Sequence, residues 1–394
     1  MTGIYRTMNN IKENLYNWVE ISESAFAHNV RFFIERITGG TELALVLKAN
    51  AYGHGMLEMA ELAVKNKIHS FCVHSLEEAI DLRKNGINEE ILIMGPVLLK
   101  NLAEIIKNNF RIVLYNPDHL STLKELTEDM KKKVRIHLKL ETGTHRQGIN
   151  EKELPEFIQH LNESSLIEPE AVYTHFANIE DTTIHDYALY QLAEFNRMIE
   201  YIKNSGFKNI KAHAACSAAT LLFPETHFNM VRLGISQYGL WPSKETMVSY
   251  KAKHPQDANN LLKPVLSWKT RVAQIKQVEA NKYIGYGCTF KTTRNSRMAV
   301  LPVGYSDGYD RGLSNQSYVL IRGKRAPVRG RICMNLIIVD ITDISGVQLE
   351  EEVVLIGKQG NEEITADYLA GLLSSINYEI VTRINWNIPR IVVN

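Results

Sequence analysis

The stretch LALVLKANAYGHGMLEMAELAVKNKIHSFCV, residues 43–73, decides the fold of this chain. It opens with one apolar run, Leu43 to Lys48, and closes with another, Ser70 to Val73. Between them, apolar residues recur at the spacing of one helix face: Met56, Met59, Ala60 and Ala63. A strand, a helix and a second strand in this order predict two parallel strands joined by a crossover helix.

Six similar runs follow this unit, and segments with helical spacing separate most of them. The runs are Ile91 to Gly95, Arg111 to Tyr115, Arg135 to Leu140, Ala171 to His175, Lys211 to Ala214 and Asn229 to Gly234. Eight strand–helix units in about 220 residues favour a closed (β/α)8 barrel over an open parallel sheet.

The pattern changes after the eighth run. The polar segment Ser249 to Pro264 indicates a linker. Five strand-like runs separated by turn residues follow it, with one helix expected over Ala366 to Ile376: Val265 to Val278, Met298 to Val303, Tyr318 to Gly323, Asn335 to Ile341 and Glu352 to Gly357. We therefore predict a barrel over residues 1–250 and a mostly antiparallel β domain over 264–394, with roughly the first 20 residues a candidate to pack on the β domain.

Composition narrows the class of protein. Lys plus Arg number 45 and Asp plus Glu number 44, a net charge of +1, which argues against a nucleic-acid-binding or membrane-surface protein. The four cysteines show no CxxC spacing, so we expect reduced thiols in a cytoplasmic protein. No signal peptide, membrane span, phosphate-binding loop or metal-ligand motif is found, and no metal site is predicted.

Chemically active side chains gather where the predicted barrel strands end. Function concentrates at the carboxyl ends of barrel strands, and loops after the seventh and eighth strands often bind phosphate. The residues at these ends and in the loops that follow are Lys48, Tyr52, Lys139, Arg146, His175, Ser217, Arg232, Gly234 and Ile235. Ser217 offers a hydroxyl and Gly234 permits close approach of the backbone, so we expect a phosphorylated ligand.

Lys48 suggests which ligand. Desolvation lowers the pKa of an ammonium group and makes the amine a nucleophile towards aldehydes, so a lysine beside a phosphate site suggests pyridoxal phosphate. Taken singly, Lys48 also fits a lysine that reaches into water, His175 a hydrogen-bonded barrel histidine and Ser217 a helix N-cap. Arg232 lies within an apolar strand and needs buried partners.

Six motifs in order now identify a family. VLKANAYGHG, VYTHFA, FNMVRLGISQYGL, GYGCTF, LPVGYSDGYDR and GRICMN resemble the motifs of alanine racemases, from about Val19 to Arg390. The resemblance implies a fold type III pyridoxal-5'-phosphate enzyme, with a barrel and a β domain. It also implies a head-to-tail homodimer whose β domain completes the site on the partner's barrel.

The resemblance assigns a role to each residue. Lys48 would bind the cofactor and act as base for one enantiomer of alanine, and Tyr286 from the other subunit would act on the opposite face. His175 would contact that tyrosine, and Arg232 would contact His175 and face the pyridine nitrogen. The phosphate ligands would be Tyr52, Ser217, Gly234 and Ile235, and the substrate carboxylate ligands Arg146 and Met334. Lys139 aligns with a lysine that is often carbamylated and then orients the arginine.

Three departures from the family pattern concern specificity. Cys216 replaces an asparagine, Asn335 an aspartate, and Trp386 a tyrosine near the phosphate and the substrate side chain. Alanine is the leading substrate, with serine or a broader range of small amino acids as the alternative. The rivals are a fold type III decarboxylase, a non-catalytic pyridoxal-phosphate carrier and a purely structural barrel. Arg232 and the acid-free ICMNL segment argue against the decarboxylase.

Overall fold

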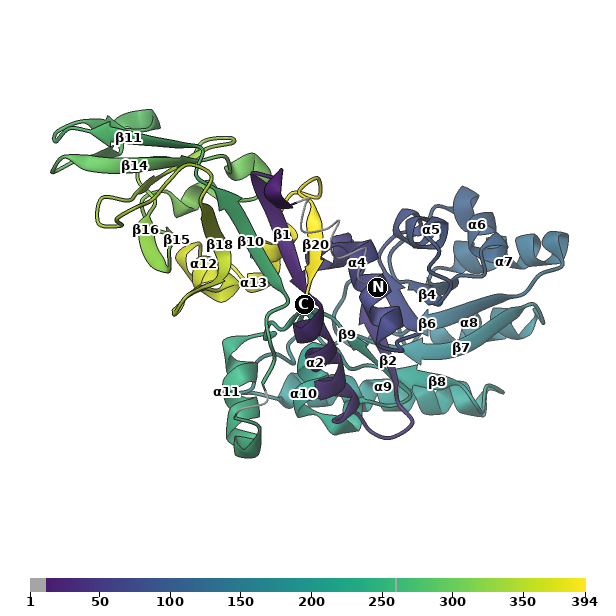
Figure 1. The fold of residues 1–394 in the computed structure, drawn as a ribbon. Coiled ribbons are helices and arrows are strands. Elements are labelled where there is room, and N and C mark those ends of the chain that lie inside the picture. The colour runs from purple at the N-terminus through teal and green to yellow at the C-terminus, as the bar shows by residue number, and fades with distance from the viewer. Residues whose placement is uncertain (1–11, 259–260) are drawn as a thin grey trace. The chain divides into compact units, whose positions relative to one another are not determined.

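The computed structural model describes residues 12–258 and 261–394, which form two compact units (Figure 1). The unit that we call the barrel unit contains 27–49, 59–258 and 261–263. The second, the β unit, contains 12–26, 50–58 and 264–394. Each unit is therefore assembled from separate segments of the chain. Among the described residues, no helix combines the length and apolar composition needed to cross a bilayer.

The barrel unit is built on eight parallel strands, and the expected (β/α)8 architecture is confirmed. The strands are β2 (Glu42–Val46), β3 (Ser70–Val73), β4 (Glu90–Ile93), β5 (Arg111–Leu114), β6 (Val134–Lys139), β7 (Ile167–Tyr173), β8 (Lys211–His213) and β9 (Met230–Leu233). Their order runs from β8 back to β2 and then to β9. The amide of Asn229 donates to Ala212 O and that of Arg232 to Ala215 O, both at 3.0 Å. These bonds bring the last two strands together and nearly close the ring.

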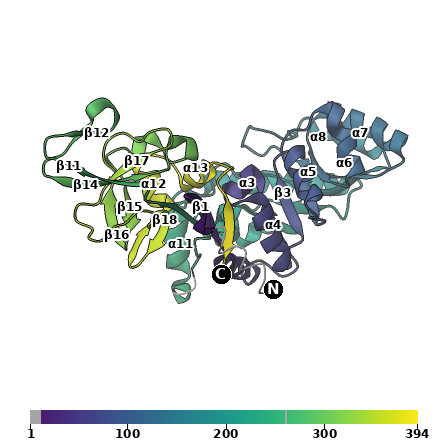
Figure 2. The ribbon, with the colours of Figure 1, turned by 45° about the horizontal axis from the view of Figure 1, so that its top comes forward.

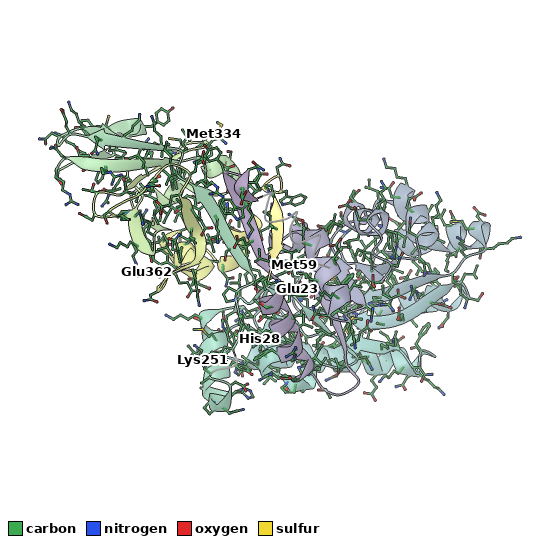
Figure 3. The ribbon with its side chains drawn as sticks, in the orientation of Figure 1. Glu23, His28, Met59, Lys251, Met334 and Glu362 are labelled. Carbon is green, nitrogen blue, oxygen red and sulfur yellow. The ribbon has the colours of Figure 1, made fainter. Side chains whose placement is uncertain are left out.

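Helices cover the strands as the apolar spacing predicts. The helices between residues 23 and 253 are α2 (Glu23–Ile34), α3 (Lys48–Tyr52), α4 (Met56–Lys65), α5 (Leu76–Lys84), α6 (Leu102–Lys107), α7 (Pro117–Met130), α8 (Leu154–Asn162), α9 (Asp186–Asn204), α10 (Ser217–Leu222) and α11 (Lys244–Lys253). Figure 2 shows α5 to α8 gathered on the outside of the barrel strands. Met59 of α4, labelled in Figure 3, is fully buried, as expected for the apolar face of a crossover helix.

The expected linker is partly wrong, because its first residues continue α11 to Lys253. Ser243 caps this helix by accepting from Thr246 N at 3.0 Å. The helix also carries Tyr250, which is buried and bonds to Asp257. Arg36 pairs with the same carboxylate at 2.7 Å. A polar composition alone did not reveal these buried partners.

The β unit contains one seven-stranded sheet and smaller sheets. Its elements are β1 (Asn17–Ser22), β10 (Leu266–Arg271), β11 (Gln274–Val278), β12 (Tyr283–Ile284), β13 (Phe290–Lys291), β14 (Ser296–Leu301), β15 (Tyr318–Ile321), β16 (Lys324–Pro327), β17 (Ile337–Asp340), β18 (Glu352–Gln359), β19 (Glu362–Ile364), α12 (Ala366–Leu372), α13 (Asn377–Thr382) and β20 (Arg390–Val393). In the large sheet, β1 pairs antiparallel with β10 and parallel with β20. The expected mostly β architecture is confirmed.

Two element limits differ from the expectation. The run Val265 to Val278 forms two strands, because the amide of Val272 bonds to Glu351 O and that of Ala273 to Val300 O, which transfers the chain from one sheet to another. The expected helix over 366–376 ends at Leu372, and Ser374 has a left-handed φ of 52° that stops its continuation.

Candidate active site

Lys48 lies just beyond β2 at the carboxyl end of the barrel. Burial and the nearby Arg146 lower the pKa of its ammonium group. The following amide, that of Ala49, donates to Glu78 Oε1 at 2.7 Å, which fixes the backbone beside the lysine. A partly desolvated amine with a lowered pKa is suited to react as a nucleophile or a base.

The four residues after Lys48 form a left-handed turn. Residues 49–52 all have φ between 52° and 55°, although none is glycine. A left-handed conformation costs roughly 1–2 kcal/mol for each such residue, so the surrounding structure must hold this turn in place. Asn50 contributes by accepting from Met56 N through Oδ1 at 2.8 Å and from Gly53 and Gly55 through its carbonyl oxygen. Strain of this kind concentrates at functional sites.

A cluster of cations surrounds His175. Burial, together with the charges of Arg232, Arg146, Lys139 and Lys48, lowers the pKa of this imidazole to about 3. The barrel therefore brings together the predicted lysines, arginines and histidine at one end. Such a site attracts an anion and keeps His175 neutral at physiological pH.

Lys139, at the end of β6, is buried within this cluster. Burial, Arg146 and Arg232 lower the pKa of its ammonium group to about 8. Its Nζ donates to Gln147 Oε1 at 3.4 Å. The loop that carries Arg146 is held by Glu141, which accepts from Gly143 N at 2.6 Å and from Arg146 N at 3.3 Å. Lys139 and Arg146 thus repel each other unless an anion lies between them.

Arg232 finds its partners inside the barrel. Its guanidinium lies beside His213 Nδ1, 2.6 Å from Nη1, and donates to the carbonyl oxygens of Thr174 at 2.9 Å and Ala214 at 3.1 Å. It also lies over the ring of Tyr173, 5.0 Å from the centroid. These contacts satisfy a buried charge and fix the orientation of the side chain.

A polar chain runs from Arg232 along the barrel interior, where apolar residues are usual. His213 Nε2 lies 2.9 Å from His137 Nδ1, and His137 Nε2 lies 3.7 Å from Glu170 Oε2. Because arginine has only donors, His213 Nδ1 must accept. The His213 proton then sits on Nε2 and the His137 proton on its own Nε2, which is aimed at the carboxylate.

Glu170 is the negative end of this chain. Its burial alone would raise the pKa of the carboxyl group, but His137 and Arg111 outweigh burial and lower it to about 2. Arg111 Nε lies 2.8 Å from Glu170 Oε2. The sequence reasoning missed His137, His213 and Glu170. Strand alternation was the available signal, since His137 and Lys139 are two residues apart and face the same side of β6.

The predicted phosphate site is built around Ser217, which is buried. Its Oγ accepts from Gly234 N at 3.0 Å and from Ser236 N at 3.3 Å. Ile235, between these amides, is buried as well. Both lone pairs of the hydroxyl are used, and no described residue accepts its proton. Ser217 can therefore donate to an added oxygen acceptor such as a phosphate.

The remaining predicted residues belong to the β unit. Tyr286, Met334 (Figure 3) and Trp386 are exposed by 73%, 56% and 62%. Asn335 donates to Ser306 Oγ at 2.7 Å, and the carbonyl of Met334 accepts from the same serine at 2.8 and 3.0 Å. Tyr52 is half-buried, with its ring 6.0 Å from that of Tyr378. The structure thus divides the predicted site residues into two sets, one in each unit.

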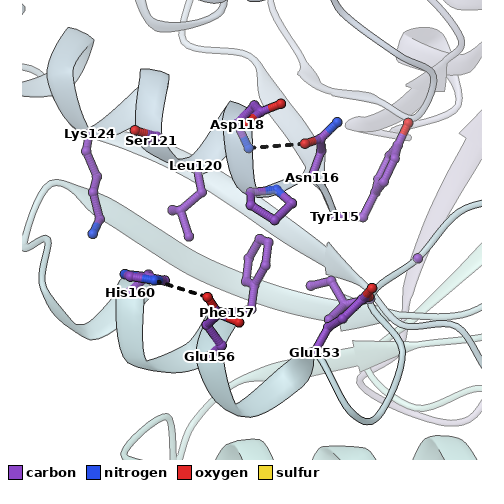
Figure 4. A pocket seen from close by; sticks show the side chains of 13 residues that line it. Tyr115, Asn116, Asp118, Leu120, Ser121, Lys124, Glu153, Glu156, Phe157 and His160 are labelled. Carbon is purple, nitrogen blue, oxygen red and sulfur yellow. Dashed lines mark hydrogen bonds and ion pairs between the residues drawn. The ribbon is translucent and has the colours of Figure 1, made fainter.

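A cavity of about 790 Å³ lies between α7 and α8, on the outside of the barrel (Figure 4). None of the residues that line it is a predicted site residue. Tyr115, on its wall, accepts from Gln147 Nε2 at 3.0 Å, and Gln147 also bonds to Lys139. Two side chains thus link the wall of the cavity to Lys139, and the residues that line the cavity do not include the candidate chemistry.

Comparison with known proteins agrees with this geometry. The family models "Alanine racemase, N-terminal domain" and "Alanine racemase, C-terminal domain" match residues 21–242 and 265–392. The chain is 39% identical to an alanine racemase of Leptospira interrogans over the full length of both, and 37% identical to one of Methanococcus maripaludis over 95% of this chain and 98% of that protein.

Solved structures show the same relationship. Alanine racemase from Bacillus anthracis with bound L-Ala-P superposes with a TM-score of 0.87 and 34% identity, covering 96% of this chain and 95% of that one. The enzyme from Bartonella henselae with covalently bound pyridoxal phosphate gives 0.83 and 27%, covering 96% and 100%. With both family models matched and a barrel whose strand ends carry the expected lysines, histidine and arginines, this chain belongs to the alanine racemase family and is an isomerase.

Proposed function

We propose that the chain interconverts L- and D-alanine by a two-base mechanism with pyridoxal 5'-phosphate. One observation carries the proposal: a partly buried lysine of lowered pKa, Lys48, lies at the barrel end that also holds Arg146, His175 and Arg232. The amine is suited to bond an aldehyde, and the cations are suited to hold a phosphate and a carboxylate.

The donor set fits this cofactor. Lys48 would bond its aldehyde carbon, the Ser217 hydroxyl would donate to its phosphate, and Arg232 would face its ring nitrogen. Tyr52, Gly234, Ile235 and Trp386 are further proposed contacts. When bound, pyridoxal phosphate would disperse the negative charge left on the substrate α-carbon. The Bartonella henselae relative binds this group covalently.

Arg232 would set the electronic character of the bound ring. Its guanidinium is permanently charged and has only donors, so it would leave the ring nitrogen without a proton. His213 at 2.6 Å holds the guanidinium in one orientation. The α-carbon charge would then be less strongly withdrawn, which favours rapid return of a proton over side reactions.

Two bases would act on opposite faces of the α-carbon. Lys48, whose lowered pKa increases the neutral fraction of its amine, would move a proton on one face. Tyr286 of the partner subunit would act on the other, which requires a homodimer with shared sites. The 73% exposure of this side chain within its own chain supports a role at an interface.

Arg146 and the backbone of Met334 would hold the substrate carboxylate. Carbamylation of Lys139 would replace its repulsion of Arg146 with an attraction, so we propose that Lys139 carries this modification. Alanine is the proposed substrate, and the alanine racemase from Bacillus anthracis has L-Ala-P bound. Cys216, Asn335 and Trp386 leave serine as the second candidate substrate.

We also propose a cytoplasmic location for the protein. This part of the proposal rests on its four unpaired cysteines.

The direct test combines product analysis with absorption spectra. Purified protein should convert L-alanine to D-alanine, measured by chiral chromatography, and should be yellow. Lys48→Ala should lose the yellow absorption and the activity, whereas Lys133→Ala, a change at an exposed lysine, should keep both. An unchanged spectrum in Lys48→Ala would remove the cofactor assignment, and an amine product with loss of carbon dioxide would indicate a decarboxylase.

The second base has its own test. In deuterated solvent, Tyr286→Phe should slow proton removal from one enantiomer selectively, and Tyr283→Phe, a neighbouring exposed tyrosine, should not. Equal loss in both directions would contradict the two-base mechanism. Mixing inactive Lys48→Ala chains with inactive Tyr286→Ala chains should restore part of the activity if sites are shared. Verified mixed dimers without activity would show that each chain builds its own site.

A further inference from the structure

Arg390, the first residue of β20, donates every hydrogen bond described for it to main-chain carbonyl oxygens. Nε and Nη2 donate to Gly53 O at 3.1 and 2.8 Å. The remaining bonds go to Asn385 O at 2.7 Å, Trp386 O at 3.1 Å, Ile388 O at 2.6 Å and Ile384 O at 3.2 Å. One planar guanidinium thus joins two segments that are more than 300 residues apart.

Each segment carries one of the proposed cofactor contacts. Gly53 directly follows Tyr52 at the end of the left-handed turn. The other segment, 384–388, contains Trp386. Both segments belong to the β unit. Arg390 therefore links the backbone next to Tyr52 to the backbone of Trp386.

Close packing around Gly53 shows that the loop after Lys48 fits tightly against α13. Its φ is +86°, and a Cβ there would lie 1.9 Å from Val381 O. The rings of Tyr52 and Tyr378 are 6.0 Å apart. The loop thus lies directly on α13 and the segment after it, and only an arginine can reach carbonyls of both parts with a rigid fork of donors.

The charged guanidinium of Arg390 is largely buried, which is energetically unfavourable. Burial lowers the pKa of its guanidinium to about 10, and Glu58 acts in the opposite direction. A buried cation retained on carbonyl oxygens indicates that the geometry of those carbonyls matters. Nothing in the proposed chemistry uses this residue, which lies outside the cation cluster of the barrel unit.

We propose that Arg390 is a positioning residue that holds the loop after Lys48 against segment 384–388 and so sets the affinity for pyridoxal phosphate through Tyr52 and Trp386. This inference rests on the proposed function, because it takes Tyr52 and Trp386 as cofactor contacts. It adds a residue that acts only through backbone carbonyls.

The test compares Arg390→Lys with Arg271→Lys in the full-length chain. Arg271 also donates to main-chain carbonyls in the β unit, those of Leu15, Glu350 and Lys12, so it controls for general loosening. Amide hydrogen exchange is measured before and after addition of pyridoxal phosphate, and cofactor affinity is measured by fluorescence titration. A third variant, Arg390→Ala, is titrated with and without millimolar guanidinium chloride.

We expect exchange at residues 53–58 and 384–388 to accelerate in Arg390→Lys, and affinity for the cofactor to fall by about tenfold or more. Arg271→Lys should bind like the unchanged chain, and guanidinium should restore part of the affinity of Arg390→Ala. Unchanged exchange in both segments, or equal loss of affinity in Arg271→Lys, would overturn the inference. Faster exchange with unchanged affinity would overturn the link to the cofactor.

Failure of the proposed function looks different. If the unchanged chain binds no pyridoxal phosphate at all, the cofactor assignment fails. The exchange rates of the two segments then still decide whether Arg390 joins them.

Discussion

Replacing Lys139 by methionine should make the protein more stable at pH 7. The barrel buries this ammonium group beside Arg146 and Arg232, and burial and these two arginines lower its pKa from 10.5 to about 8. Each pKa unit corresponds to about 1.4 kcal/mol, so keeping Lys139 protonated costs the folded state about 3 kcal/mol of stability. Lys139→Met keeps most of the side-chain length and removes that charge.

The sign of the pH dependence follows from the protons bound. Below pH 8, Lys139 is protonated in both the folded and the unfolded state, so the full cost is present. Between pH 8 and 10.5 the unfolded chain holds a proton that the folded chain has lost, and the stability of the unchanged protein rises with pH. The advantage of Lys139→Met should therefore shrink from about 3 kcal/mol at pH 7 towards zero near pH 10.5.

Urea unfolding followed by circular dichroism in buffers free of carbon dioxide measures this difference. Lys152→Met, at an exposed lysine, is the control and should show no such trend. A difference between Lys139→Met and the unchanged protein that stays constant from pH 7 to 10.5 would refute the reasoning. Added bicarbonate should stabilise the unchanged protein and leave Lys139→Met unaffected, because only a carbamate on Lys139 can attract Arg146.

Three further changes test the described contacts. His213→Phe should lower the free energy of unfolding in urea by about 3 kcal/mol, because it leaves a buried donor of Arg232 without its acceptor. The variant should also lose less stability than the unchanged protein below pH 6.5. Burial strongly lowers the pKa of His213, so this residue takes up a proton only on unfolding. Ser217→Ala should cost about 1–3 kcal/mol, because two buried amides lose their acceptor, and equal urea midpoints would contradict this. Gly53→Ala should lower the melting temperature sharply, because its Cβ would lie 1.9 Å from a carbonyl oxygen at a φ of +86°, whereas Gly39→Ala, which has open space, should not.

The site residues that could be predicted from the sequence are those that lie at or near the ends of the barrel strands. Lys48, Lys139, His175 and Arg232 were found because each lies within or at the end of an apolar run, and the carboxyl ends of parallel strands meet at one end of a barrel. Ser217 was found by the same rule, and the structure adds the two amides that it accepts.

The site residues that the sequence did not reveal are those whose roles depend on side chains from other strands. His137, His213 and Glu170 read as ordinary polar residues within strands, since strand alternation predicts which face a side chain occupies but not what lies opposite. The distances of 2.9 and 3.7 Å that join them cross from β6 to β8 and from β6 to β7. In the same way, nothing in the run Val265 to Val278 revealed that its amides bond to two different sheets.

The sequence by itself determined the order of the barrel strands, the β architecture that follows and the types of side chain at the strand ends, because hydrophobic periodicity and turn residues are local properties. Only the tertiary structure decided the protonation and the anchoring of those side chains. The pKa of Lys139, the tautomers of the buried histidines and the bonds of Arg390 are set by burial and by partners distant in sequence, and electrostatic energy depends on spatial separation rather than on position along the chain.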